Sequence, residues 1–150
     1  AAGGINSGKS MLAVMVLGAD GVQVGSRFVA SQESSAHDAF KQKVIEAKDG
    51  DTLLTLKELA PVRLLKNKFF QDLQTAYANG ASKEELKDVL GRARAKRGMF
   101  EGDMDEGELE IGQISGAINE IKPAQQIVQD IMREYRSSIV DAQYLKSFEG

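Results

Sequence analysis

The spacing of apolar positions changes along the chain, from strand-like runs near the start to helical spacing after residue 34. Residues 11–17 are apolar on every side, follow an N-cap candidate at Ser7 and stop at Gly18, so they predict a buried helix. The short run at 21–24 is too apolar for an edge strand and predicts a buried parallel strand. Residues 1–2 fit the end of a second strand. Because a helix that is apolar all round needs cover on both sides, the pattern favours an α/β protein.

From Ser35 onward the spacing of apolar residues is mostly helical. We expect a helix over 35–47, a strand-like segment at 52–56, a helix over 62–77, a helix over 82–96 that opens with a capping box, a helix over 108–119 and a long helix that starts at Pro123. The long helix carries Ile127, Ile131, Tyr135 and Ile139 on one stripe. We expect the last few residues to fray.

The strand content is too small for the fold that the pattern favours. Two strand ends cannot form a stable parallel sheet with helices over both faces. The sequence therefore predicts that this chain is the C-terminal portion of a larger α/β protein, or one fragment of it. Alone, the apolar helix over residues 11–17 would expose a large patch and promote aggregation, so we expect a partner segment to cover it.

Composition narrows the function classes. The 150 residues carry a net charge of -3, 42% hydrophobic residues and no cysteine, which suits one soluble domain or a piece of one. The lack of cysteine excludes disulfides and thiolate metal sites and agrees with a cytoplasmic protein. No apolar run approaches the roughly 18 residues that span a bilayer, and the start lacks the basic residues of a signal peptide, so we expect no membrane role. The acidic balance argues against nucleic-acid binding, and the one basic run, Arg92, Arg94, Lys96 and Arg97, is interpreted as a solvated helix end.

Two glycine turns are the most informative feature of the chain. The first is Ala1-Ala2-Gly3-Gly4-Ile5, and the second is Val22-Gln23-Val24-Gly25-Ser26, about twenty residues later, which is the length of one strand-helix-strand step. Glycine lets backbone N–H groups approach an anion because no Cβ intervenes, and a helix that starts just beyond adds its own unpaired donors. The pair predicts a phosphate site, with two plain turns as the alternative.

A P-loop is a second interpretation of the first turn. Gly3, Gly8, Lys9 and Ser10 have the spacing of the P-loop pattern. A P-loop protein also needs a second strand that ends in an aspartate to hold Mg²⁺, and the run that ends at Asp20 lies in and just past the first helix. A nucleotide-binding protein is therefore a remote alternative.

Two further features attract attention but carry simpler interpretations. His37 is the only histidine, and its place after Ser34-Ser35 favours hydrogen bonding at the start of a helix over a role as catalytic base. In the acidic loop at 101–107, Gly107 and Glu108 fall where a calcium loop needs a ligand and then a glycine. We therefore expect a solvated loop and no metal site.

Four segments together resemble a known family. They are residues 1–5, 17–28, 33–37 and 107–116, and they are similar to the C-terminal half of the nitronate monooxygenase family, formerly called 2-nitropropane dioxygenases. That family also contains the bacterial FMN-dependent enoyl-acyl-carrier-protein reductases. The resemblance implies an α/β fold in which this chain is the C-terminal portion of a TIM (β/α)8 barrel, supplying the last two strand ends, plus a mostly helical C-terminal region. Residues 1–34 would then form the last strand-helix-strand part with the phosphate loops, and 35–150 a helical region that packs on the barrel.

The resemblance also implies an FMN site. Barrels of this kind hold phosphate at the loops after strands seven and eight, which is where both glycine turns would lie. The residues that would bind the cofactor are Ala2, Gly3, Gly4, Gln23, Gly25 and Ser26. Ser26 occupies a position that is often threonine in the family, and either hydroxyl can donate to phosphate. Arg27 would either neutralise phosphate or pair with an acidic neighbour.

Other roles of the family lie partly outside this sequence. The catalytic histidine precedes the first phosphate loop in the family, so no catalytic residue is expected in this chain. Gln113 falls in the family's Gly-Gln pair near the active site and would be a substrate-side or structural contact. The remaining N-terminal part of the same barrel is the expected partner, this chain alone is expected to be inactive, and a homodimer is left open.

Two reactions follow from the resemblance. As a nitronate monooxygenase, the protein would oxidise an alkyl nitronate with O₂ to a carbonyl compound and nitrite. As an enoyl-acyl-carrier-protein reductase of fatty acid biosynthesis, it would use NAD(P)H to reduce an enoyl thioester. In the second case a basic surface at Arg63, Lys66 and Lys68 would serve an acidic carrier protein, although a charged helix face is usually just solvated.

Overall fold

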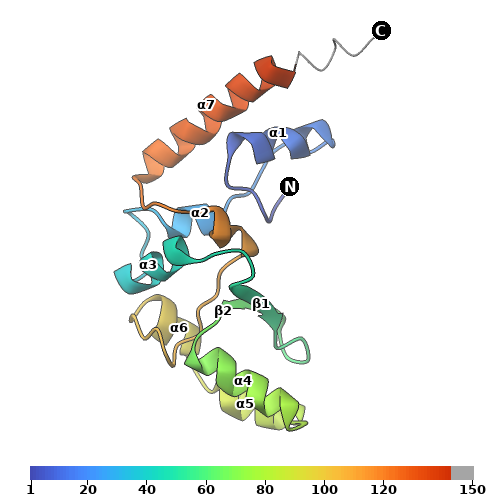
Figure 1. Ribbon diagram of the computed structural model, residues 1–150, viewed down its shortest axis with the longest axis vertical. Helices are drawn as coiled ribbons and strands as arrows, with labels where there is room; N and C mark the ends of the chain where they lie inside the picture. Colours follow the sequence, from blue (N-terminus) through green and yellow to red (C-terminus); the bar gives the residue numbers. More distant parts are fainter. Residues whose placement is uncertain (143–150) are drawn as a thin grey trace.

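The computed structural model describes residues 1–142 and shows a mixed helix and strand structure. In Figure 1 the chain is elongated, with α1 and α7 at one end and α4 and α5 at the other. The elements are α1 (Gly8–Val16), α2 (Ser26–Val29), α3 (Asp38–Glu46), β1 (Thr52–Thr55), β2 (Val62–Leu65), α4 (Lys68–Ala78), α5 (Lys83–Leu90), α6 (Arg94–Met99), the 3-10 helix η1 (Gln113–Ala117) and α7 (Ala124–Ala142). None of the helices within residues 1–142 has the length and apolar character needed to cross a membrane. The expected fraying of the last residues falls at 143–150, outside the described part.

The N-terminal part contains the predicted helix and the predicted parallel pairing. α1 begins with a capping box in which the side chains of Ser7 and Ser10 each accept from the other residue's backbone N–H. Ala2 and Gln23 form an isolated parallel bridge, and the Gln23 N–H donates to the Ala1 carbonyl at 2.8 Å. The prediction of a buried strand at 21–24 is wrong for the described residues, because Gln23 is exposed and no further strand lies beside it there.

α7 packs on α1 although more than a hundred residues separate them. The contact is close because Gly8 has no side chain: a Cβ added there would lie 2.1 Å from the backbone nitrogen of Tyr135. Ile127 and Ile131 on the predicted stripe of α7 are buried, whereas Ile139 is 38% exposed, so only the first part of the stripe is covered by the described residues.

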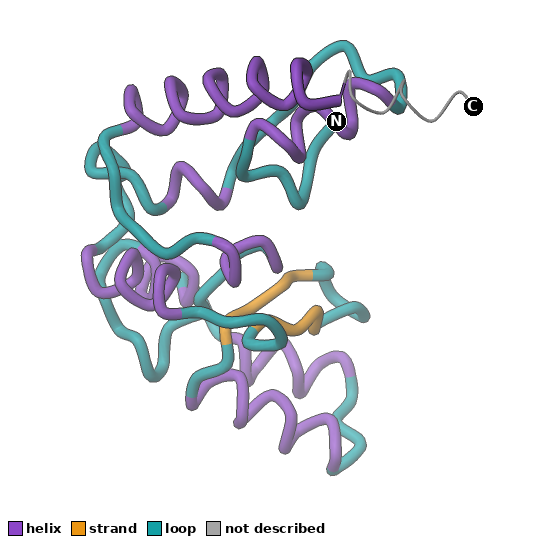
Figure 2. Tube along the Cα trace, turned by 45° about the horizontal axis from the view of Figure 1, so that its top comes forward, coloured by secondary structure: helices purple, strands orange, loops and turns teal. Residues whose placement is uncertain are grey.

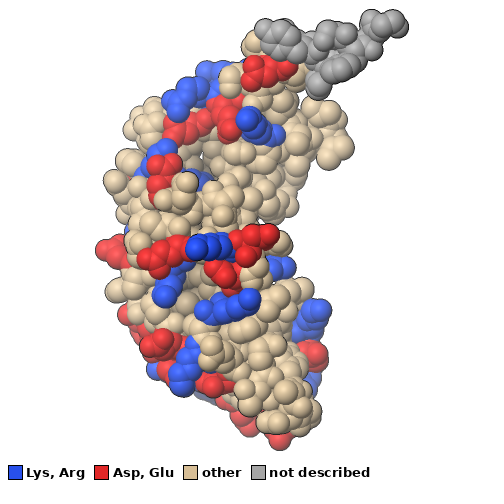
Figure 3. Space-filling model, viewed as in Figure 1, with Lys and Arg blue, Asp and Glu red and all other residues tan. Residues whose placement is uncertain are grey.

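The opposite side of α1 lacks the cover that its apolar sequence requires. Val16 is 78% exposed and Leu17 is 85% exposed. The surface over α1 carries few charged side chains in Figure 3. The expected two-sided cover is therefore present on the α7 side only, within residues 1–142.

Two apolar clusters hold the rest of the chain together. The first joins α3 to the segment before α7, through Phe40, Val44, Leu109, Ile111 and Ile118. The second lies between the β1–β2 hairpin and helices α4 and α5, and its buried members are Leu56, Leu64, Phe69, Phe70, Leu73 and Leu86. The strands of the hairpin are antiparallel, with Thr52 opposite Leu65. Figure 2 shows this strand pair between the two ends of the molecule.

The predicted helix over 62–77 is wrong in its first part. Residues 62–65 form β2, and the helix begins only after Asn67, whose side-chain oxygen accepts from the Phe70 N–H at 2.9 Å. Pairing on both edges of β2 explains the difference. β1 lies on one edge, and on the other the Leu65 N–H donates to the Leu109 carbonyl at 3.0 Å.

Two other predicted helices differ from the structure. The capping box at Ser82 and Glu85 is confirmed, but α5 ends at Leu90 because Gly91 has a φ of +64°, and α6 starts after a second left-handed residue at 93. The predicted helix over 108–119 is wrong: residues 109–111 are extended beside β2, where the Ile111 N–H donates to the Arg63 carbonyl at 3.1 Å, and only the short η1 follows.

Candidate functional site

The two glycine turns border one hollow of about 320 Å³. The parallel bridge between Ala2 and Gln23 brings the turns together, because each bridged residue lies just before the glycines of its turn. The hollow is lined by Ala2, Gly3, Gly4, Ile5, Gln23, Gly25, Ser26, Gly112 and Ile114. The structure therefore brings together all six residues that the sequence analysis named for the cofactor.

The glycines of this hollow are needed for different reasons. Gly3 and Gly4 have φ angles of +85° and +71°, a backbone conformation that favours glycine. Gly25 has a φ of -105°, and a Cβ added there would meet no atom within 4 Å. Neither backbone strain nor crowding within the described residues requires a glycine at position 25. The open space beside it is a cradle that a side chain would fill, which fits a bound phosphate.

Ser26 links the second turn to a distant segment. Its Oγ accepts a hydrogen bond from the Gly112 N–H at 3.2 Å. A Cβ on Gly112 would lie 2.7 Å from that oxygen, so only glycine permits this approach. A hydroxyl that accepts one bond still has its own proton to donate, and Ser26 lines the hollow. Sequence reasoning missed Gly112 and Ile114, since their only signal was their place beside Gln113.

Gln113 lines a neighbouring hollow of about 380 Å³ rather than the glycine hollow. Gly4 and Ile114 line both hollows, so the two are adjacent. Asp49, from the loop after α3, also lines the second one. Gln113 is exposed at the start of η1, where it can meet a ligand that extends from one hollow into the other.

The start of α1 does not have the arrangement of a P-loop. The Gly8 N–H donates to the Glu134 carboxylate at 2.7 Å, so a protein anion occupies the place of a nucleotide phosphate. The Ser10 hydroxyl donates to the Ser7 carbonyl at 2.9 Å, and Lys9 is exposed. The structure thus gives the remote nucleotide-binding alternative no support.

Arg27 lies outside the glycine hollow. Its buried guanidinium donates to the carbonyls of Ala30 and Glu120, at 3.3 and 3.1 Å. Burial lowers its pKa, and the carboxylates of Glu120 and Asp130 oppose this effect. The structure therefore shows Arg27 bonded to backbone carbonyls, and not in contact with the hollow or in an ion pair with an acidic neighbour within residues 1–142.

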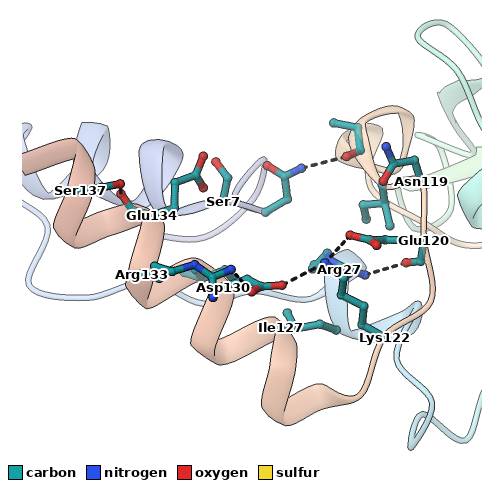
Figure 4. Close-up of a pocket in the computed structure, with 14 residues that line it drawn as sticks. Ser7, Arg27, Asn119, Glu120, Lys122, Ile127, Asp130, Arg133, Glu134 and Ser137 are labelled. Carbon is teal, nitrogen blue, oxygen red and sulfur yellow. Dashed lines mark hydrogen bonds and ion pairs between the residues drawn. The ribbon is translucent and has the colours of Figure 1, made fainter. Parts of the chain in front are cut away.

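Arg27 lines a larger cleft of about 550 Å³ between the residues just before α1, α7 and residues 117–122, shown in Figure 4. Lys122 in this cleft contacts Glu120 at 2.6 Å and Asp130 at 2.9 Å, and Arg133 also pairs with Asp130. Hydrogen bonds from Lys122 and Gln126 lower the pKa of Asp130 to about 2. Because these charges are paired with one another, the cleft is less suited to an anion than the glycine hollow.

His37 has the structural role predicted for it. Its Nδ1 accepts from the Ala39 N–H at 3.1 Å and thereby caps α3, which starts at Asp38 rather than near Ser35. His37 lines neither of the hollows described above.

The acidic loop and the basic run pair with each other. Arg97 contacts Asp103 at 2.7 Å, Lys96 contacts Glu101 at 2.8 Å and Arg94 contacts Glu106 at 3.5 Å. Lys96 and Arg97 are still exposed, as the interpretation of a solvated helix end requires, whereas Arg94 is half-buried where the loop folds back over α6. Within residues 1–142 no group of three or more histidine, aspartate or glutamate side chains is arranged to hold a metal ion.

The basic surface expected at residues 63, 66 and 68 is largely engaged within the chain. Arg63 donates to the Thr52 carbonyl at 3.0 Å, and Lys68 pairs with Glu106 and Asp72. Only Lys66 among the three is not seen in such a contact within the described part of the chain. Of the three, only Lys68 is paired with carboxylates of residues 1–142, while Arg63 keeps its charge because a carbonyl is neutral.

Comparisons with known proteins identify the relatives of this chain. The sequence model of the nitronate monooxygenase family matches residues 1–134. A probable nitronate monooxygenase from Bacillus subtilis (strain 168) is 30% identical over 135 residues, which cover 89% of this chain and 39% of that protein. The curated relative from Staphylococcus aureus (strain MSSA476) is 31% identical, with 38% of its length covered.

Solved structures show the same fold over this region. FabK from Thermotoga maritima superposes with a TM-score of 0.87 and 36% identity, over 96% of this chain and 46% of that one. Nitroalkane oxidase from Streptomyces ansochromogenes gives a TM-score of 0.70 and 30% identity, over 93% and 40%. The chain therefore spans less than half the length of the relatives it matches.

Proposed function

Because this chain belongs to the nitronate monooxygenase family, we propose that it supplies the FMN-phosphate site of a flavin-dependent oxidoreductase. The observation that carries this proposal is the single hollow on which both glycine turns converge. The open cradle at Gly25 supports it independently, since nothing within the described residues requires glycine there.

Each part of the hollow has a proposed role. The backbone N–H groups of the Gly3-Gly4 turn bind one side of the phosphate, and Gly25 with the Ser26 hydroxyl binds the other. Ala2 and Gln23 hold the turns side by side through their bridge, and Gln23 is in place to contact the cofactor. FMN, when bound, would supply the electron chemistry. Gln113 in the adjacent hollow faces the substrate side.

The larger architecture is part of the same proposal. We place Ala2 and Gln23 at the ends of the last two strands of a TIM barrel, of which this chain is the C-terminal portion. The parallel bridge, the position of the turns and the superposition on larger enzymes support this placement. Residues 1–34 and 35–150 keep their proposed division, with α7 returning to pack on α1. The catalytic base lies outside this chain in the proposal.

Oxidation of an alkyl nitronate with O₂ is the first candidate reaction. The family match and the names of the curated relatives support it. Reduction of an enoyl thioester with NAD(P)H is the second candidate, and the likeness to FabK supports it. The ion pairs of Lys68 weaken one argument for a carrier-protein surface, and the family match favours the nitronate reaction.

The test uses the purified protein that contains this chain in its full length. Flavin absorbance at about 450 nm supports the proposed cofactor, because that band belongs to the flavin itself. Oxygen uptake that depends on an alkyl nitronate identifies the first reaction, whereas NAD(P)H consumption that depends on an enoyl thioester identifies the second. A colourless protein that binds ATP with Mg²⁺ would overturn the proposal in favour of the P-loop alternative.

A further inference from the structure

Glu134 links helix α7 to the start of α1 by a hydrogen bond. Its Oε2 accepts from the Gly8 N–H at 2.7 Å, across 126 residues of sequence. Figure 4 shows its side chain projecting from α7 beside Ser7. The close approach of the two helices at Gly8 makes this bond possible, since any side chain at Gly8 would meet the backbone of Tyr135.

The carboxylate lies where a helix attracts an anion. The first-turn N–H groups of α1 have no partners within the helix, and the positive end of the helix dipole is located there. The Ser7 hydroxyl accepts a hydrogen bond from the Ser10 N–H at 3.1 Å. The Glu134 carboxylate accepts a charge-assisted hydrogen bond from the Gly8 N–H. The protein itself thus occupies this anion position, and a ligand phosphate in the hollow depends on the glycine turns instead.

The bond also lies close to the first glycine turn. Only Ile5, Asn6 and Ser7 separate Gly4 from Gly8. Ile5 is 4% exposed, and the Asn6 side chain donates to the Ala117 carbonyl at 3.3 Å. Glycines lose more conformational freedom on ordering than other residues, so the turn depends on anchors at both of its ends. The bridge at Ala2 anchors one end, and the capped start of α1 anchors the other.

We propose that Glu134 is a positioning residue that holds the first glycine turn in place for a ligand phosphate; this inference rests on the proposed function. Glu134 acts through Gly8 and does not touch the ligand. Its contribution therefore belongs to the phosphate-dependent part of flavin binding. FMN and riboflavin differ only in that phosphate, so the ratio of their dissociation constants measures this part.

The experiment compares the two flavins on the full-length apoprotein and three variants. The native protein is expected to bind FMN much more tightly than riboflavin. Glu134→Ala is expected to lower this preference about tenfold, the size of one lost charge-assisted hydrogen bond. Glu134→Gln keeps an oxygen that accepts from Gly8 and is expected to stay within about threefold of native. Asp141→Ala removes an exposed carboxylate from the same helix and is the matched control, expected to keep the native preference.

Three outcomes overturn the inference. The first is an equal weakening of FMN and riboflavin by Glu134→Ala, which identifies a role in general stability only. The second is a Glu134→Gln variant as impaired as Glu134→Ala. If Glu134→Ala does not fold, Glu134→Asp takes its place, because its shorter side chain draws the carboxylate away from Gly8. The third outcome is an unchanged preference for FMN over riboflavin in that variant. A native protein that binds neither flavin fails at the proposed function itself, which distinguishes that failure from these three.

Discussion

Gly25 differs from the glycines of the first turn in what it requires of the backbone. Gly3 and Gly4 are fixed by left-handed φ angles, whereas Gly25 has an ordinary φ and open space around it. A side chain at position 25 would therefore leave the fold intact and occupy only the hollow. This separation of folding from binding makes Gly25 the most direct probe of the proposed site.

Replacement of Gly25 by valine is expected to lower FMN retention by more than about tenfold, because the side chain fills the approach of the phosphate. The flavin content after gel filtration measures the effect. Gly21→Val is the matched control, since Gly21 is also exposed to open space but does not line the hollow. Unchanged flavin content in Gly25→Val would remove the phosphate role of the second turn.

Glu108 makes stability depend on pH. It is 8% exposed, and its burial, aided by the negative charge of Glu110, raises its pKa to about 7, with Arg94 opposing the shift. The folded state therefore holds a proton between about pH 4.3 and 7 that the unfolded state has released. The contribution of Glu108 to the free energy of unfolding is complete below that range and is lost as the pH rises through 7.

We expect the free energy of unfolding to fall by about 2 kcal/mol between pH 5 and pH 8 through Glu108. Glu108→Gln, which cannot ionise, should show a smaller fall over the same range. Urea titrations at several pH values measure both proteins. Parallel pH curves for the two proteins would contradict the assignment.

At the scale of elements, local signals were predicted well and distant pairings were not. The N-cap at Ser7 and the capping box at Ser82 each involve residues three positions apart, so the sequence shows them directly. The strand at 62–65 and the extended segment at 109–111 form by pairing with each other across more than forty residues. Helical spacing in both segments misled the prediction, because tertiary pairing outweighs local periodicity.

The contact of α1 with α7 leads to a prediction of stability. Gly8→Ala places a Cβ against the backbone of α7 and is expected to lower the free energy of unfolding by about 1–3 kcal/mol. Lys9→Ala is the control one residue along: Lys9 is exposed, so both stability and flavin binding should stay at native values. Chemical denaturation measures the first effect. A Gly8→Ala variant as stable as native would show that the helices separate at little cost.

At the scale of the whole molecule, the candidate site was predicted in part. The two glycine turns could be identified from the sequence, because their spacing matches one strand-helix-strand step. The contact of Gly112 with Ser26 could not, since 86 residues separate the two and neither has a pattern that indicates the other.

The exposed apolar residues predict how the chain behaves when produced alone. Four apolar side chains at the end of α1 and on α7 are about half exposed or more: Val16, Leu17, Val128 and Val140. We expect residues 1–150 to self-associate in solution, and the double variant Val16→Lys with Leu17→Lys to do so less. Light scattering over a concentration series measures this. A chain that stays monomeric throughout would contradict the need for a covering segment.

The bond from Gly112 to Ser26 has a thermodynamic consequence. It is a direct tie between the second glycine turn and the segment that leads from α6 to α7. A ligand that binds the Ser26 hydroxyl changes the strength of this hydrogen bond, and a shift of the segment changes the position of the hydroxyl. Linkage then requires reciprocity: what the ligand does to the order of the segment, the segment does in equal measure to the affinity for the ligand.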